Sequence, residues 1–325
     1  QWIEPEGDGF LLRNYDGVDL AFGAIAENGA ALHRGRRLLL RRRGEKLEIL
    51  DLASRSTRLF EPFLPGGQAF LRSIVDGYGN RLALHYEGRS LARITDTAGR
   101  EIVLGRDAEQ RVVAIDVVIP AEGGSGASET AHRLATYGYS PDGDLSFAAD
   151  GLGRAVQYTY DGKHRIVRKV LRNGFAVRYD YDATHGRVVR TWGDGGYHTV
   201  AFIYDFDKRT TTTHSEPQPR VYHWDEKGNI VREETFDGRR VLARKWDGDH
   251  LLLAEKNAAG EEHAYVYDAR GLLTQCTDPA GNVTRLEHVD DLLRRVVRPN
   301  GSATDYELSL IHISEPTRLR RISYA

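Results

Sequence analysis

The side chains that could support chemistry in this sequence are abundant carboxylates, 12 histidines and a single cysteine, Cys276. Paired carboxylates can act as general acid and base, histidines can bind metal, and a cysteine thiolate can act as a nucleophile. The densest acidic pair is Asp290-Asp291, and the histidines form neither a His-Glu-x-x-His motif nor a zinc pattern with paired cysteines. No Gly-x-Ser-x-Gly or Gly-x4-Gly-Lys motif is present. The sequence therefore predicts no catalytic residue, no metal site and no cofactor, and Cys276 is expected to be an inert packed thiol.

Most of the remaining candidate acids follow an aromatic residue at a regular interval. Successive copies of this marker, counted from Tyr139 to the degenerate copy at Val289, are 21, 21, 23, 20, 22, 21 and 22 residues apart. A residue that recurs in every unit is expected to serve the structure of the unit, because catalysis needs only one copy. The marker residues are Tyr139, Tyr160, Asp161, Tyr181, Asp182, Tyr204, Asp205, Trp224, Asp225, Trp246, Asp247, Tyr267 and Asp268.

A second marker, a turn signal rich in Asp, Asn and Gly, lies between copies of the first. Tight turns that join β-strands favour these residues, because glycine and asparagine tolerate positive φ. Between turns the apolar residues alternate, as at Val156, Tyr158 and Tyr160, which is typical of strands. Each unit of about 21 residues is therefore predicted to be a β-hairpin. The glycines expected in the repeat turns are Gly99, Gly153, Gly186, Gly228, Gly271 and Gly281.

The two markers also predict how the hairpins are stabilised. The acid after each aromatic is expected to accept hydrogen bonds from the backbone of its own turn. The aromatic side chains, one per unit, are expected to stack across neighbouring strands. Because a sheet of more than ten strands does not stay flat and open, the hairpins are expected to form one long sheet that curls.

Composition excludes several classes of protein. The 325 residues include 45 Lys and Arg against 47 Asp and Glu, a net charge of −2, which argues against a dedicated nucleic-acid binder. Apolar runs such as Leu38-Leu39-Leu40 are far shorter than a membrane span of about 20 residues. A single cysteine excludes an internal disulfide. The arginine-rich stretch 34–43 is expected to be a solvated or ion-paired strand edge.

The same patterns divide the chain. Residues 1–69 are predicted to be a β-rich region that precedes the repeats. Residues 70–307 contain the repeats, with a loop inserted near residues 121–133. Residues 308–325 abandon the pattern and look non-native. Because the sequence lacks Met and begins Gln1-Trp2-Ile3, we expect an internal fragment.

The repeat resembles the YD repeats of the Rhs (rearrangement hot spot) family. The motifs that carry the resemblance are Asp96-Thr97-Ala98-Gly99-Arg100, Tyr181-Asp182 with Gly186-Arg187, and Asp278-Pro279-Ala280-Gly281-Asn282. The resemblance covers about residues 70–307. It implies an all-β fold in which the hairpins form part of a hollow shell, or cocoon, around a toxic C-terminal domain.

The resemblance also implies a function. The chain would be a non-catalytic shell segment of a bacterial polymorphic toxin, made in the cytoplasm and delivered in interbacterial competition, often by type VI secretion. Its partners would be the enclosed toxin domain of the same full-length chain and secretion spike proteins contacted through a preceding region. The family's toxin and self-cleavage segments would lie beyond this fragment. The alternative is a cell-surface YD-repeat protein that binds glycans or a neighbouring cell.

Overall fold

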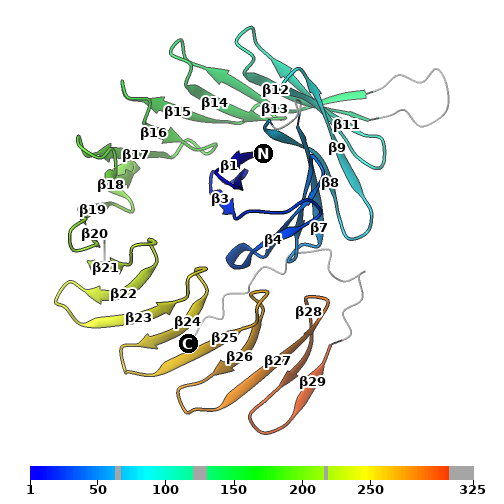
Figure 1. Cartoon of the computed structure of the whole chain (residues 1–325). Coiled ribbons are helices and arrows are strands. Elements are labelled where there is room, and N and C mark those ends of the chain that lie inside the picture. The colour runs from blue at the N-terminus through cyan, green and yellow to red at the C-terminus, as the bar shows by residue number, and fades with distance from the viewer. Residues whose placement is uncertain (63–66, 120–129, 216–218, 307–325) are drawn as a thin grey trace. The chain divides into compact units, whose positions relative to one another are not determined.

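The fold was analysed in a computed structural model, which describes residues 1–62, 67–119, 130–215 and 219–306. Residues 121–129 of the predicted loop and the whole predicted tail, 308–325, lie outside the described residues. The described chain contains 29 strands assigned to one sheet, and each strand pair whose register is described is antiparallel. Figure 1 shows the strands following one another as hairpins from β1 to β29. The prediction of an all-β chain of repeated antiparallel hairpins is confirmed.

The chain forms two compact units. The first contains residues 1–80, 245–256 and 260 onward, and the second contains residues 81–244 and 257–259. The first unit therefore combines the beginning of the chain with its last repeats.

The N-terminal part of the first unit is an eight-stranded curled sheet. Its spatial order is β3-β2-β1-β8-β7-β6-β5-β4, because β1 pairs with both β2 and β8. The short 3₁₀ helix η1 (Arg34–Arg36) joins β4 to β5. The strands are β1 (Trp2–Glu6), β2 (Gly9–Arg13), β3 (Asp19–Phe22), β4 (Ala30–His33), β5 (Leu38–Arg43), β6 (Lys46–Asp51), β7 (Ser56–Pro62) and β8 (Ala69–Val75).

This curled sheet buries most of the large apolar side chains of the described core. Alternating residues of each strand point to one face, so that neighbouring strands bury a common set. Burying a side chain of this size contributes about 1.5–3 kcal/mol to folding. The largest fully buried side chains are Phe60, Ile3, Leu12, Leu40 and Ile49.

The rest of the first unit consists of the last repeats. Its strands pair in sequence order, so that each is joined to the next by a short turn. They are β24 (Leu252–Asn257), β25 (Glu262–Tyr267), β26 (Leu273–Thr277), β27 (Val283–Val289), β28 (Leu292–Val297) and β29 (Ala303–Asp305).

The second unit is built from the remaining repeats, and β23 (Arg240–Trp246) lies at its boundary. A 3₁₀ turn, η2 (Asp194–Gly196), joins β18 to β19. The strands are β9 (Arg81–Glu87), β10 (Ser90–Thr95), β11 (Glu101–Arg106), β12 (Val112–Ile119), β13 (Thr130–Tyr139), β14 (Leu145–Asp150), β15 (Ala155–Tyr160), β16 (Ile166–Val170), β17 (Ala176–Tyr181), β18 (Val188–Gly193), β19 (Val200–Asp205), β20 (Thr210–His214), β21 (Arg220–Trp224) and β22 (Ile230–Thr235).

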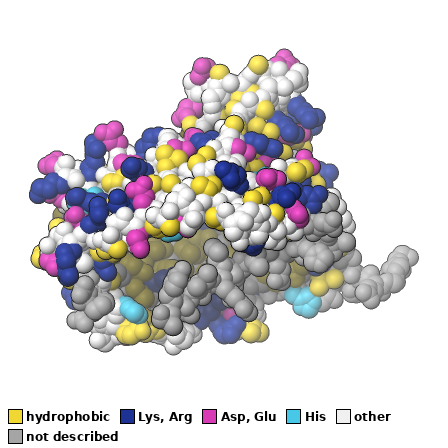
Figure 2. Space-filling model, turned by 90° about the horizontal axis from the view of Figure 1, so that it is seen from below, with side chains coloured by type: hydrophobic (Ala, Val, Ile, Leu, Met, Phe, Trp, Pro, Cys, Tyr) yellow, Lys and Arg dark blue, Asp and Glu magenta, His cyan; other side chains and the backbone are white. Residues whose placement is uncertain are grey.

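The second unit lacks a core of large side chains within its described residues. Its buried apolar residues there are three alanines, Ala114, Ala149 and Ala176. Most other strand residues are half-buried, on both faces of the sheet. Figure 2 shows Lys and Arg mixed with Asp and Glu over the visible face, with apolar side chains between them. The repeats therefore form strands that are stabilised by their neighbours rather than by a compact interior.

Candidate functional site

The repeated turn is a five-residue loop that begins with Asp. In the turn Asp161–Arg165, the N–H of Asp161 donates to the carbonyl of Arg165 (3.0 Å), and the N–H of His164 donates to the carbonyl of Asp161 (3.0 Å). One carboxylate oxygen of Asp161 accepts from the N–H groups of Lys163 (2.9 Å) and Arg165 (3.0 Å). The side chain therefore satisfies two backbone donors that the strands leave unpaired.

The second carboxylate oxygen of Asp161 is held by the residue that ends the turn. Arg165 Nε donates to it at 2.8 Å, and the same contact recurs as Arg100 to Asp96 (2.6 Å) and Arg154 to Asp150 (3.0 Å). Asparagine makes the equivalent contact elsewhere, as Asn282 Nδ2 does to Asp278 (2.9 Å). Each such turn forms a closed hydrogen-bonded unit.

The fourth residue of the turn adopts a left-handed backbone conformation. Glycine occupies this position in most turns, including five of the six predicted turn glycines, with φ between 77° at Gly153 and 83° at Gly281. The sixth, Gly186 (φ 68°), is the fifth residue of a turn that is one residue longer. A type I turn followed by a left-handed residue is the favoured three-residue hairpin loop. Three Asp turns have another residue at this position with a similar φ, namely Gln110 (64°), His164 (60°) and His250 (64°). Gly162, although part of a Tyr-Asp-Gly motif, has no positive φ.

The turn hydrogen bonds perturb the carboxylates. The Arg165 side chain, with its backbone N–H, lowers the pKa of Asp161 from 3.8 to about 2. The amide of Asn282 lowers the pKa of Asp278, and Asn80 does the same for Asp76. A group that accepts hydrogen bonds only when ionised resists protonation. The low pKa values therefore reflect turn stabilisation rather than poised acids or bases.

A β-bulge precedes the marker aromatic in most units. The strand register shifts immediately before Tyr139, Tyr160, Tyr181, Trp224 and Tyr267. A bulge inserts one residue into a strand and redirects the next side chain. The recurring bulge gives the aromatic of each of these units an equivalent setting.

The tyrosines connect neighbouring hairpins. Tyr181 donates its hydroxyl hydrogen to the carbonyl of Ile166 (2.7 Å), and the Arg165 guanidinium lies 4.5 Å from the centre of its ring. The residue that closes one turn thus stacks on the aromatic of the next unit, as a cation–π contact. The matching contacts are Tyr139 to Val112 (2.8 Å) under Arg111, and Tyr204 to Val188 (2.9 Å) under Arg187.

The other marker residues occupy related positions. Asp205 accepts from the N–H and the ammonium of Lys208, and burial raises the pKa of Tyr160 and of Tyr267. Asp182 accepts from the N–H of Arg187 (2.8 Å) in a turn one residue longer. Asp225 accepts from Asn229, Asp247 from Leu251, and Asp268 from Leu272. Trp246 ends β23.

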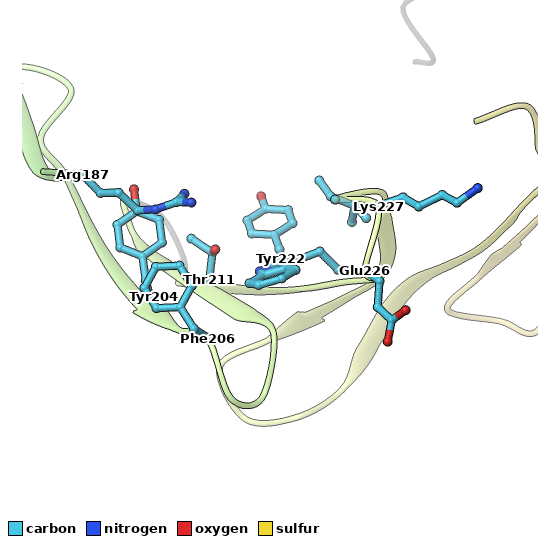
Figure 3. Close-up of a pocket in the computed structure, with 10 residues that line it drawn as sticks. Arg187, Tyr204, Phe206, Thr211, Tyr222, Glu226 and Lys227 are labelled. Carbon is cyan, nitrogen blue, oxygen red and sulfur yellow. The ribbon is translucent and has the colours of Figure 1, made fainter. Parts of the chain in front are cut away.

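An open pocket of about 590 Å³ lies over β19 to β22 in the second unit. Strand register places Tyr204, Thr211 and Tyr222 in one row across three strands. Figure 3 shows Tyr204 and Phe206 beside Arg187, Tyr222 on the other side, and Thr211 between them. The Phe206 and Trp224 rings meet edge-on, 6.4 Å apart, as an aromatic contact between neighbouring units. Ring faces beside a guanidinium can hold an apolar or planar group next to an acidic one.

The residues that could support catalysis are not brought together within the described ranges. Cys276 is half-buried in β26, opposite Tyr265 and Thr284. His164 contacts Asp144 at 3.0 Å in an exposed position. In the described part of the chain, no group of three or more His, Cys, Asp or Glu is placed to hold a metal ion. Nor is any helix there long and apolar enough to cross a membrane.

Comparison with known families identifies the repeat. Residues 246–283 match the model described as RHS Repeat. This segment contains three Asp turns, Asp247–Leu251, Asp268–Leu272 and Asp278–Asn282. The strands between them, β24, β25 and β26, pair as antiparallel hairpins like the strands of the earlier repeats.

The chain is also similar to solved toxin structures. It shares 10% identity with a TcdB2-TccC3 crystal structure (TM-score 0.41; 79% of this chain and 18% of that one). It shares 10% identity with TcdB2-TccC3-Cdc42 (TM-score 0.42; 95% and 21%). It shares 11% with a Photorhabdus luminescens Tc holotoxin pore (TM-score 0.36; 89% and 18%). The chain spans about a fifth of these chains, and no curated protein matches it.

One set of residues escaped the sequence reasoning. Arg34 and Arg37, in the arginine-rich stretch, form ion pairs with Asp247 and Asp291 of the last repeats, more than 200 residues away. A sequence signal did exist, because Leu251 and Leu272 replace the Arg or Asn that closes the other turns. The role of these two leucines depends on contacts with a distant part of the chain, which no local sequence pattern reveals.

Acid should destabilise the repeated Asp turns. Because folding lowers the pKa of Asp161, its carboxylate stabilises the fold fully above pH 3.8, and this contribution is lost as the pH falls toward about 2. We expect Asp161→Asn to lower stability at neutral pH and to reduce the pH dependence of urea unfolding between these values. Asp142→Asn, in an exposed neighbouring turn, is the control. Equal effects of the two substitutions would contradict this account.

The tyrosine contact between units should also be measurable. Tyr181→Phe removes the donor to the carbonyl of Ile166 and should lower the free energy of unfolding by about 1 kcal/mol. Tyr179→Phe, two residues earlier in the same strand, makes the same chemical change away from this contact. Urea denaturation of both variants would test the assignment, and a Tyr181→Phe variant as stable as the control would refute it.

Proposed function

We propose that this chain is a non-catalytic segment of a shell that encloses a toxin domain of the same full-length protein. The observation that carries the proposal is the burial pattern of the second unit. Its described strands bury no apolar side chain larger than alanine, while the tyrosines, phenylalanines and tryptophans of this unit are half-buried or exposed. A sheet of this kind is completed when another polypeptide covers its apolar face.

The aromatic pocket over β19 to β22 supports this function. Tyr204, Tyr222 and Trp224 offer ring faces, and Arg187 offers donors for a carboxylate. Such a surface suits an extended polypeptide with mixed apolar and acidic side chains. The same surface also favours the second candidate, a cell-surface protein that binds glycans, because sugar rings stack on aromatic faces. Specific retention of the chain on a glycan array would favour that candidate.

The proposal also includes the delivery of the full-length toxin to a target cell. The match of residues 246–283 to the RHS Repeat model supports a secreted or delivered toxin used in competition between bacteria. In this scheme type VI secretion is the route, and spike proteins contact a region that precedes this segment. The toxic activity belongs to the enclosed domain, so that the segment itself is not an enzyme.

Removing one repeat should open the shell. Deleting residues 161–181 from the full-length protein removes two turns with β16 and β17, and joins Tyr160 to Asp182, which restores the marker pair. Strand β15 then takes the place of β17 beside β18, so the hairpins can still pair. We expect the toxin domain to become sensitive to added protease, as measured by the survival of its intact fragment.

The control for this experiment is Gly162→Ala in the same segment. A Cβ at Gly162 meets no atom within 4 Å, so this variant should protect the toxin domain as well as the parent does. If the deletion variant folds and its toxin domain remains fully protected, the shell function is wrong.

A further inference from the structure

Two turns of the first unit, Asp247–Leu251 and Asp268–Leu272, differ from the other Asp turns in their fifth residue. Leucine donates its backbone N–H to the first carboxylate oxygen, at 2.9 Å in both turns, but its side chain offers no donor to the second. Among the described turns, those closed by a side chain of the fifth residue end in Asn80, Arg100, Arg111, Arg154, Arg165, Asn229 and Asn282.

Arg34 contacts both of these turns and supplies the missing side-chain donor to Asp247. Its guanidinium lies 2.6 Å from the second carboxylate oxygen of Asp247 and 3.1 Å from Asp249, and its Nε donates to the carbonyl of Asp268 at 3.1 Å. One side chain from the 3₁₀ helix η1 therefore bridges two consecutive repeats. The guanidinium fork suits this arrangement, because it directs several N–H groups to different acceptors at once.

The backbones approach so closely that glycine is required on both sides. A Cβ on Gly35 would lie 2.0 Å from the carbonyl oxygen of Asp249, and one on Gly271 would lie 2.8 Å from that of Arg34. Neither contact can be relieved by moving a flexible side chain, because the atoms that would clash belong to the backbone. The backbone of residues 34–35 is thus in close contact with the backbone of these two turns.

The contact continues onto the next repeat. Asp291 is only 8% exposed and lies between two arginines, with Arg270 at 2.6 Å and Arg37 at 3.4 Å. Asp290 and Asp291 both have positive φ, 50° and 65°, and the Asp290 carbonyl accepts from Arg55 at 3.3 Å. This acidic pair therefore serves docking rather than catalysis.

Leucine also contributes apolar area to the contact. Leu272 is 7% exposed, whereas the side chain of Arg154, at the same position of the self-contained turn Asp150–Arg154, is 62% exposed. Burying a leucine side chain is favourable, while burying an arginine there would require a partner for its charge. Leucine at the fifth position thus gives the turn Asp no side-chain donor from its own turn, and it also adds buried apolar area to the contact.

We infer that the fifth residue of the Asp turn determines whether the turn is self-contained or a docking site. Arg or Asn closes the turn, whereas Leu251 and Leu272 reserve it for the segment Arg34-Gly35-Arg36-Arg37 of the same chain. The docked segment is a latch that holds the N-terminal curled sheet against the last repeats. This inference concerns the first unit alone and stands whether or not the protein encloses a toxin.

Leu251→Arg in the full chain is the direct test. The introduced arginine supplies Asp247 with the donor that the self-contained turns have, so it competes with Arg34 and leaves the turn intact. We expect hydrogen exchange of the amides in residues 33–38 to become about tenfold faster, because local opening becomes easier. Exchange in β6 and β7, inside the curled sheet, should stay unchanged.

Two controls separate docking from general effects of charge. Leu253→Arg adds the same side chain two residues further on, at a site that is already 38% exposed, and should leave residues 33–38 unaffected. Arg154→Leu opens a turn of the second unit and should also leave them unaffected. If Leu251→Arg and Leu253→Arg change exchange at residues 33–38 equally, or neither changes it, the inference is wrong.

A second variant keeps the test decisive if Leu251→Arg disturbs the fold. Arg34→Gln removes the cation without changing either repeat turn, and should accelerate exchange at residues 33–38 to a similar extent. Unchanged exchange in this variant would overturn the latch.

Discussion

A carboxylate that accepts two backbone N–H groups inside its own turn is the interaction on which the repeats depend. In the turn Asp161–Arg165 it closes a loop whose ends must leave in antiparallel directions, and the closing arginine then reaches the aromatic of the next unit. Turn formation and contact between neighbouring repeats therefore share one residue. Because units closed by such an arginine supply both, hairpins can be added in series without a common core.

The two units use this interaction in different ways. In the first unit, the curled sheet of residues 1–75 buries large apolar side chains and provides the stability that single hairpins lack. In the second, side chains stay half-buried and the turns are self-contained. This contrast is consistent with the proposed role of the second unit as a wall, and with the first unit as the place where distant parts of the chain are fastened together.

The features that could be predicted from the sequence are those that depend on local repetition. Hairpins, their period and the six turn glycines follow from residue types at fixed spacing, and the turn acids could be placed beside them. The arginine over the ring of Tyr181 was not predicted, because it depends on how successive hairpins align. Nor was His164 at a position that favours glycine. The contact between Arg34 and Asp247 depends on residues 213 positions apart, which no periodicity encodes.

The central claim is that another polypeptide completes the aromatic face of the repeats. A high-resolution cryo-electron microscopy structure of the full-length protein tests it most directly. The account predicts density for a further segment of the chain against Tyr204, Tyr222 and Trp224. A structure in which these rings are covered by neighbouring repeats, with no other polypeptide beside them, would contradict it.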